Sequence, residues 1–178
     1  MRELPERKQI RLRDYDYSQA GCYFITICAK NRECLFGDIV GGEMLPNEYG
    51  MIAKSEIERI STRYDNVSIG GYVIMPNHVH LIVRINPSER INPFPTKVAD
   101  IPNIIGKYKA GVTRIVGNAF MRSAKRAIWQ GRYHDHIIRN EKSYQEIAEY
   151  IENNPMRWEL DCHNPQNHKY NDWNDNND

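Results

Sequence analysis

The stretch MPNHVHLIV, residues 75–83, places two histidines two positions apart in a run of aliphatic and β-branched residues. Alternate residues of a β-strand point to opposite faces of a sheet. Val79, Leu81 and Val83 are therefore expected to face a core, whereas His78 and His80 share the face left for solvent or a ligand. The stretch predicts a strand over residues 78–85 that carries two imidazoles side by side.

The segments around this strand indicate a chain that mixes strands and helices. Its β-branched and aromatic runs predict further strands at residues 21–29, 34–40 and 67–76, and a short extended segment within 128–138. Regularly spaced apolar residues predict helices at 46–63 and 104–116. A last helix is expected to begin near Ser143, where Ser143 and Glu146 match a capping box, and to stop at Asn154 before Pro155. The prolines of residues 86–102 predict an irregular loop.

Length and composition favour one domain. With 178 residues and 40% hydrophobic content, the chain can bury a single core. We expect one catalytic domain over residues 1–158 and a polar, acidic, loosely ordered tail over 159–178. No apolar run predicts a signal peptide or a membrane span, and the four cysteines form no CxxC pair. These features favour a cytoplasmic protein with free thiols.

The two histidines and the last helix together suggest a metal site. Two imidazoles on one strand face can chelate a divalent ion, although the same pattern also fits two surface histidines. On the helix, Tyr150 and Asn154 are four residues apart and share a face. A cation held near the Asn154 carbonyl would favour the phenolate of Tyr150, whose ordinary pKa is about 10. The simpler alternative is that Tyr150 is one of 11 tyrosines and Asn154 merely ends the helix.

Positive charge gathers in the second half of the chain. The net charge is only +1, but residues 104–142 hold nine basic side chains against two acidic ones. This stretch can follow a phosphate backbone or form an ordinary solvated helix face. It also contains a second histidine pair, His134 and His136, which we interpret as not binding the catalytic metal. The candidates for DNA contact are Lys107, Lys109, Arg114, Arg132 and Arg139.

Three blocks, taken together and in this order, resemble the HUH single-tyrosine transposases, and among them the REP-associated tyrosine transposases. They are PNHVH at residues 76–80, the block from Trp129 to Asn140, and YIENNP at residues 150–155. The resemblance implies an α+β fold with a ferredoxin-like palm, in which helices pack on one face of an antiparallel sheet. It further implies His78, His80 and Asn154 as ligands of Mg²⁺ or Mn²⁺, with Tyr150 as nucleophile. Many relatives carry glutamine at the position of Asn154.

The expected activity follows from this resemblance. It is metal-dependent cleavage and joining of single-stranded DNA through a 5′-phosphotyrosine intermediate, on hairpin or repetitive palindromic DNA, with a homodimer left open. The alternatives are a nucleic-acid-binding regulator without catalysis, a nicking enzyme of the replication-initiator type, and a hydrolase that activates water. Tyr108 is a competing nucleophile on a basic helix, but its position fits no motif of the family.

Overall fold

An antiparallel sheet forms the centre of the molecule. The computed structural model describes residues 15–87, 99–120 and 127–167. Its main sheet has the strand order β4-β5-β1-β6, and every neighbouring pair is antiparallel. The strands are β1 (Gly21–Cys28), β4 (Val67–Ile74), β5 (His78–Ile85) and β6 (His134–Ile138). The α+β architecture with an antiparallel sheet, expected from the sequence, is confirmed.

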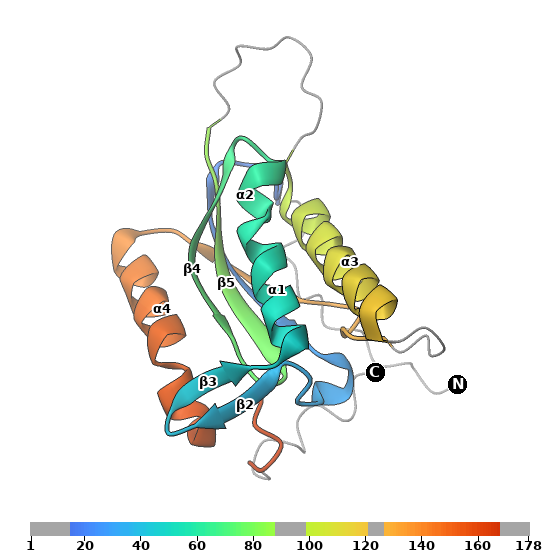
Figure 1. Ribbon diagram of the computed structural model, residues 1–178. Coiled ribbons are helices and arrows are strands. Elements are labelled where there is room, and N and C mark those ends of the chain that lie inside the picture. Colours follow the sequence, from blue (N-terminus) through green and yellow to red (C-terminus); the bar gives the residue numbers. More distant parts are fainter. Residues whose placement is uncertain (1–14, 88–98, 121–126, 168–178) are drawn as a thin grey trace, which may run out of the picture.

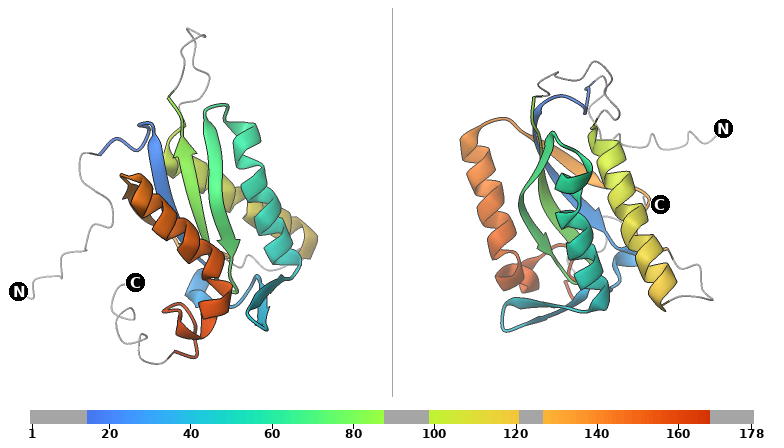
Figure 2. Two further views of the ribbon diagram at one scale, coloured as in Figure 1. Left: turned by 90° about the vertical axis from the view of Figure 1, so that its left-hand side faces the viewer. Right: turned by 45° about the horizontal axis from the view of Figure 1, so that its top comes forward.

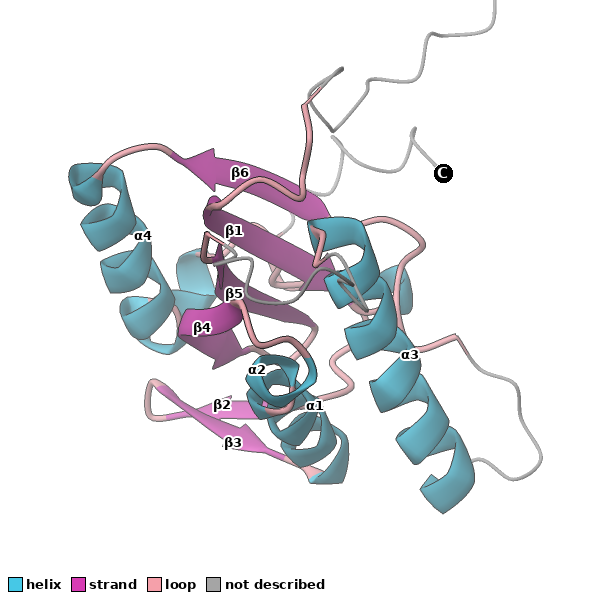
Figure 3. Ribbon diagram, turned by 90° about the horizontal axis from the view of Figure 1, so that it is seen from above, coloured by secondary structure: helices cyan, strands magenta, loops and turns pink. Residues whose placement is uncertain are grey.

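Helices cover both faces of this sheet (Figure 1). On one face lie α1 (Glu48–Glu58), α2 (Ile60–Arg63) and α3 (Ile101–Phe120). On the other face lies α4 (Glu141–Asn153), as the view along the sheet in Figure 3 makes clear. The helices α1, α2 and α3 thus lie on one face of the sheet, as expected, and α4 forms a second helical layer on the opposite face. Among the described residues, none of the helices has both the length and the apolar character that crossing a membrane requires.

The two layers follow from the alternation of side chains along β5. Val79, Leu81 and Val83 are fully buried in the large core that α1 and α3 cover, as the sequence predicted. Ile82 points the other way and packs with Ile151 of α4 in a smaller cluster. Because both faces of β5 are covered, its histidines are also buried. The sequence had instead predicted that their face of the strand is left for solvent or a ligand.

A hairpin and two short 3₁₀ helices lie outside the main sheet. A separate hairpin pairs β2 (Gly37–Val40) with β3 (Glu43–Pro46). Its turn is Gly41-Gly42, with φ angles of 60° and 81° that favour glycine. Short 3₁₀ helices η1 (Lys30–Arg32) and η2 (Pro155–Leu160) follow β1 and α4 (Figure 2).

The start of α4 differs from the sequence prediction. The expected capping box on Ser143 is wrong, because the helix begins at Glu141. Asn140 is the N-cap, and its side-chain oxygen accepts a hydrogen bond of 2.8 Å from the backbone N–H of Ser143. The C-terminal boundary is as predicted, since the helix ends at Asn153 and Asn154 precedes Pro155.

A buried carboxylate of α1 is paired with two arginines and lies against α3, which gives a test of the packing. The carboxylate of Glu56 is fully buried and bonds Arg63 at 2.6 Å and Arg59 at 3.1 Å. A Cβ added to Gly111 of α3 would collide with this carboxylate. We expect Gly111→Ala to lower the free energy of unfolding by about 1–3 kcal/mol in urea denaturation, because the added methyl would displace a buried carboxylate from its two arginine partners. Gly106→Ala on the same helix is the control: its Cβ would meet nothing within 4 Å, so it should stabilise by about 0.5–1 kcal/mol.

Candidate metal and nucleophile site

His78 and His80 of β5 face α4 with their ring nitrogens together. Their Nε2 atoms are 3.0 Å apart, and the two side chains are 0% and 2% exposed. Two nitrogens at this separation can both lie about 2.1 Å from one divalent ion. The period-2 pattern of the sequence therefore produces a pair of converging ligands.

Hydrogen bonds at the other ring nitrogen orient each histidine. The Nδ1 of His78 is 2.8 Å from the side-chain oxygen of Asn77, and the Nδ1 of His80 is 2.9 Å from the hydroxyl of Thr26. Such outer contacts fix ring orientation in metal sites. Burial lowers the pKa of His80 to about 3 and holds the pKa of His78 well below its usual value. Both rings are thus neutral near pH 7, which is the form that binds metal.

Tyr150 of α4 lies directly beside this pair. Its hydroxyl is 3.3 Å from Nε2 of His80, and its ring packs edge-on to Phe24, with centroids 6.1 Å apart. The residue is 39% exposed, so a substrate can reach the phenol. Burial and then the charge of Asp161 raise the pKa of Tyr150, while a hydrogen bond with Asn154 acts in the opposite direction.

Asn154 completes the group of residues that the sequence singled out. It is the C-cap of α4 and is only 3% exposed. Its side-chain oxygen is buried and has no hydrogen-bond partner among the described residues. A buried polar atom without a partner is costly, and a bound cation would satisfy it. Two imidazole nitrogens and an amide oxygen are donors that fit a divalent metal, and the assignment of these three residues as ligands stays a prediction.

Asp161 also reaches the histidines, although the sequence reasoning did not select it. One of its carboxylate oxygens is 3.8 Å from Nε2 of His78, and the ligand atoms of His78, His80 and Asp161 lie within 4.8 Å of one another. Asp161 belongs to the segment that the sequence assigned to a loosely ordered tail. The carbonyls of Cys162 and His163 in this segment accept hydrogen bonds from Arg32 and Asn77, whereas residues 168–178 lie outside the described part. Nothing in the sequence spacing pointed to Asp161.

Tyr108, the competing nucleophile, lies on the other side of the sheet. It is fully buried in the large core beneath α3, and burial raises its pKa. It is therefore remote from the imidazole pair.

The basic candidates divide between two regions. Lys107, Lys109 and Arg114 are on α3, across the sheet from Tyr150. Lys109 donates hydrogen bonds to the carbonyls of Gln130 and Gly131, at 2.6 and 3.1 Å, and Lys107 lies 5.2 Å above the ring of Tyr64. Arg122, Lys125 and Arg126 of the basic stretch lie outside the described residues.

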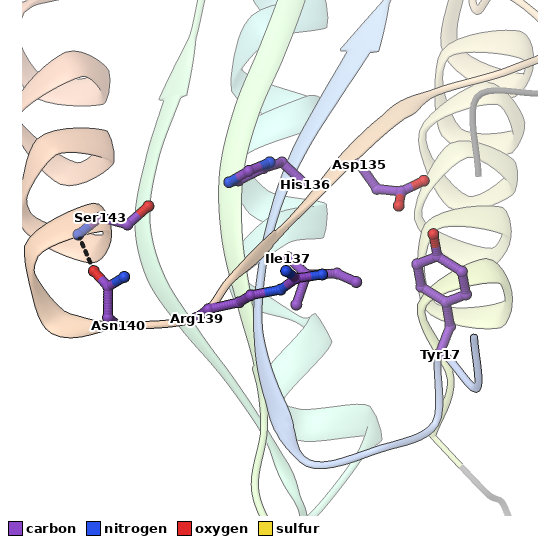
Figure 4. Close-up of a pocket in the computed structure, with 7 residues that line it drawn as sticks. All are labelled: Tyr17, Asp135, His136, Ile137, Arg139, Asn140 and Ser143. Atoms are coloured by element: carbon purple, nitrogen blue, oxygen red, sulfur yellow. Dashed lines mark hydrogen bonds between the residues drawn. The ribbon is translucent and has the colours of Figure 1, made fainter. Parts of the chain in front are cut away.

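Arg132 and Arg139 are exposed at the two ends of β6, which is an edge strand. A cavity of about 430 Å³ lies along this strand (Figure 4). It is lined by Tyr17, Asp135, His136, Ile137, Arg139, Asn140 and Ser143.

The second histidine pair does not converge on a metal site. The register of β6 against β1 sets His136 opposite Phe24 and His134 opposite Thr26, so both share the sheet face of His80. Both are exposed. Within the described ranges, no cluster of three candidate ligand side chains includes either residue. The interpretation that they do not hold the catalytic metal stays a prediction, which this geometry favours.

Comparison with known proteins gives a consistent set of relatives. Residues 19–154 match the family model described as "Transposase IS200 like". An uncharacterized protein of Haemophilus influenzae is 42% identical over 170 residues, covering 89% of this chain and 93% of that protein. A REP-associated tyrosine transposase of Escherichia coli K12 is 26% identical over 141 residues, covering 79% of this chain and 70% of that protein.

The fold is also similar to that of a solved structure. It is a REP-associated tyrosine transposase bound to a REP hairpin, with a TM-score of 0.59 and 23% sequence identity. The match covers 83% of this chain and 73% of that one.

Proposed function

The chain belongs to the IS200-like transposase family, and from this premise we propose that it is a metal-dependent endonuclease and strand-transferase for single-stranded DNA. The observation that carries the proposal is the phenol of the partly exposed Tyr150, whose hydroxyl lies 3.3 Å from Nε2 of His80. A nucleophile, neutral imidazoles and an unpartnered amide oxygen meet at one place on the molecule. Such a constellation is what phosphoryl transfer to a side chain needs.

Tyr150 is the nucleophile in this mechanism. Its oxygen attacks the phosphorus, the bond from phosphorus to the 3′ oxygen breaks, and the phenol proton is released while the 3′ oxygen takes up a proton. The product is a 5′-phosphotyrosine link with a free 3′-OH, which conserves the bond for transfer to another strand. Because burial opposes the phenolate, the hydrogen bond from the amide of Asn154 helps to favour it.

His78, His80 and Asn154 are the proposed ligands of Mg²⁺ or Mn²⁺. When bound, the ion polarises the scissile phosphate and neutralises charge that develops on it. Asn77 and Thr26 hold the two rings in place, and the partnerless oxygen of Asn154 gives a third donor. The mixed nitrogen and oxygen donors are compatible with either ion.

The proposed substrate is hairpin or repetitive palindromic DNA with a single-stranded flank. One relative of the same fold is bound to a REP hairpin, which supports this choice. The ring of Phe24 packs against Tyr150, and Phe24 is paired across the strands with His136 on the same face of the sheet. His136 and Arg139 both line the cavity along β6. A strand that passes the nucleophile can continue across these neighbours, with its phosphates near Arg139 and Arg132.

The deciding experiment is incubation with labelled single-stranded hairpins and Mn²⁺, followed by intact mass measurement and peptide mapping. The expected result is a DNA adduct on Tyr150 and a released strand ending in a 3′-OH. Cleavage without an adduct would indicate a hydrolase that activates water. Binding without cleavage would indicate a regulator.

The arginines that flank β6 give a separate prediction for binding. Replacing Arg132 and Arg139 together with alanine should weaken binding to a single-stranded oligonucleotide. The slope of log affinity against log salt should become less negative by about 1.4, because each single-strand phosphate contact contributes about −0.7. Fluorescence anisotropy between 50 and 300 mM salt measures both quantities. Lys54→Ala, an exposed cation on α1, is the control; an equal slope in the double variant and this control would refute the contact.

A further inference from the structure

The chain beyond η2 returns to the histidine pair. Asp161 follows η2, and its side chain is only 4% exposed. Its carboxylate accepts a hydrogen bond of 2.7 Å from the backbone N–H of His163 and lies 3.8 Å from Nε2 of His78. Within the described ranges it makes no ion pair with a lysine or arginine. A buried carboxylate is normally paired with a cation or bound to a metal, so its place beside two converging imidazoles calls for an explanation.

Asn77 fastens this segment to the strand that carries the histidines. Its amide nitrogen donates to two carbonyls, of Arg32 at 3.0 Å and of His163 at 2.7 Å. Those two bonds fix the direction of the amide, so the side-chain oxygen must face Nδ1 of His78, 2.8 Å away. That nitrogen therefore carries the proton, and Nε2 of His78 presents its lone pair to the site. One side chain thus orients a ligand and anchors the turn that bears Asp161.

A second contact holds the same turn from η1. The guanidinium of Arg32 donates a hydrogen bond of 3.2 Å to the carbonyl of Cys162. Asn31 and Arg32 have φ angles of 54° and 53°, in the left-handed region that residues other than glycine seldom adopt. Strained backbone of this kind persists only where surrounding contacts impose it. The turn is therefore placed by contacts from two other parts of the chain.

We propose that Asp161 is a further ligand of the metal centre, and that Asn77 is the positioning residue that brings it there. The inference rests on the proposed metal-dependent function and deepens it. The buried, partnerless oxygen of Asn154 at the same site is independent support, because it points to a cation that both residues would share. The centre then combines two imidazoles, an amide oxygen and a carboxylate, a mixed nitrogen and oxygen donor set that can hold a divalent ion such as Mn²⁺.

The first test is titration of the full chain with manganese chloride by isothermal calorimetry, without DNA. Asp161→Asn retains an oxygen that can accept the hydrogen bond from His163 but removes the charge. If Asp161 is a ligand, the affinity for Mn²⁺ should fall about 10- to 100-fold. If the residue only shapes the turn, affinity should stay the same, and the proposal is overturned. Glu159→Gln, an exposed acid two residues earlier, is the matched control and should bind Mn²⁺ as wild type does.

The second test isolates Asn77. Asn77→Asp keeps an oxygen for His78 but loses the two donated hydrogen bonds that anchor the turn. It should weaken Mn²⁺ binding in the wild-type background and have little further effect in an Asp161→Asn background, because both changes remove the same ligand. Fully additive losses would overturn the positioning role. Circular dichroism melting of each variant checks that the fold is retained.

These outcomes separate the inference from the proposed function. Normal Mn²⁺ binding by Asp161→Asn, together with an adduct on Tyr150 in the wild type, would remove Asp161 from the centre and leave the transposase chemistry standing. Weakened Mn²⁺ binding by Asp161→Asn, together with no DNA adduct in the wild type, would support Asp161 as a ligand and refute the proposed strand-transfer activity.

Discussion

Tyr150→Phe is expected to abolish formation of the DNA adduct and to lower cleavage by at least about 10⁴-fold, while hairpin affinity changes less than about twofold. The variant loses only the attacking oxygen. Its ring can still pack against Phe24 and His80, so the site should keep its shape. Gel analysis of labelled hairpins with Mn²⁺ measures cleavage, and anisotropy measures binding.

Two other tyrosines serve as controls for this result. Tyr144 is on the same helix, where its ring lies 5.6 Å from the guanidinium of Arg84. Tyr108 is the alternative nucleophile, buried in the opposite core. Phenylalanine at either position should leave adduct formation intact. If Tyr150→Phe still formed an adduct and Tyr108→Phe did not, the assignment of the nucleophile would be wrong.

The strands and the histidine pair were predictable because their signals are local. A strand has a side-chain period of two, so Val79 and Leu81 on one side require His78 and His80 on the other. The bounds of β5 agree with the prediction, and the strand at 21–29 differs by one residue. Tyr150 and Asn154 share a helix face for an equally local reason. Local periodicity thus defined each half of the candidate site.

What the sequence did not reveal depends on contacts between distant parts of the chain. The placement of α4 on the second face of the sheet needs Ile151 to meet Ile82, 69 positions earlier, and no period within α4 specifies that partner. Asp161 is a similar case. In the sequence it stands among acidic and asparagine residues that resemble a solvated tail. The contacts that bury it come from distant residues, since Asn77 and Arg32 bond the carbonyls of His163 and Cys162 beside it. The prediction of the N-cap of α4 was wrong for another reason. Asn140 and Ser143 are both residue types that cap helices well, and the local sequence does not choose between them.

The second large expected effect is the loss of Mn²⁺ binding and cleavage when a histidine of the first pair is replaced. His80→Ala should reduce Mn²⁺ binding at least about 100-fold and bring cleavage to background, because it removes a proposed ligand that also contacts the hydroxyl of Tyr150. Calorimetry without DNA and the gel assay with DNA measure the two losses separately. The loss of metal binding should appear even in a Tyr150→Phe background, since the ligand and the nucleophile are different groups.

His136→Ala is the matched control, because it comes from the other HxH sequence and lies on the same sheet face, two strands away from β5. Its ring is exposed and converges with no third ligand in the described part of the chain. It should bind Mn²⁺ as wild type does, and any effect should be confined to DNA affinity through the cavity that it lines. The reverse result, with Mn²⁺ binding lost in His136→Ala and kept in His80→Ala, would move the metal centre to β6 and separate it from Tyr150.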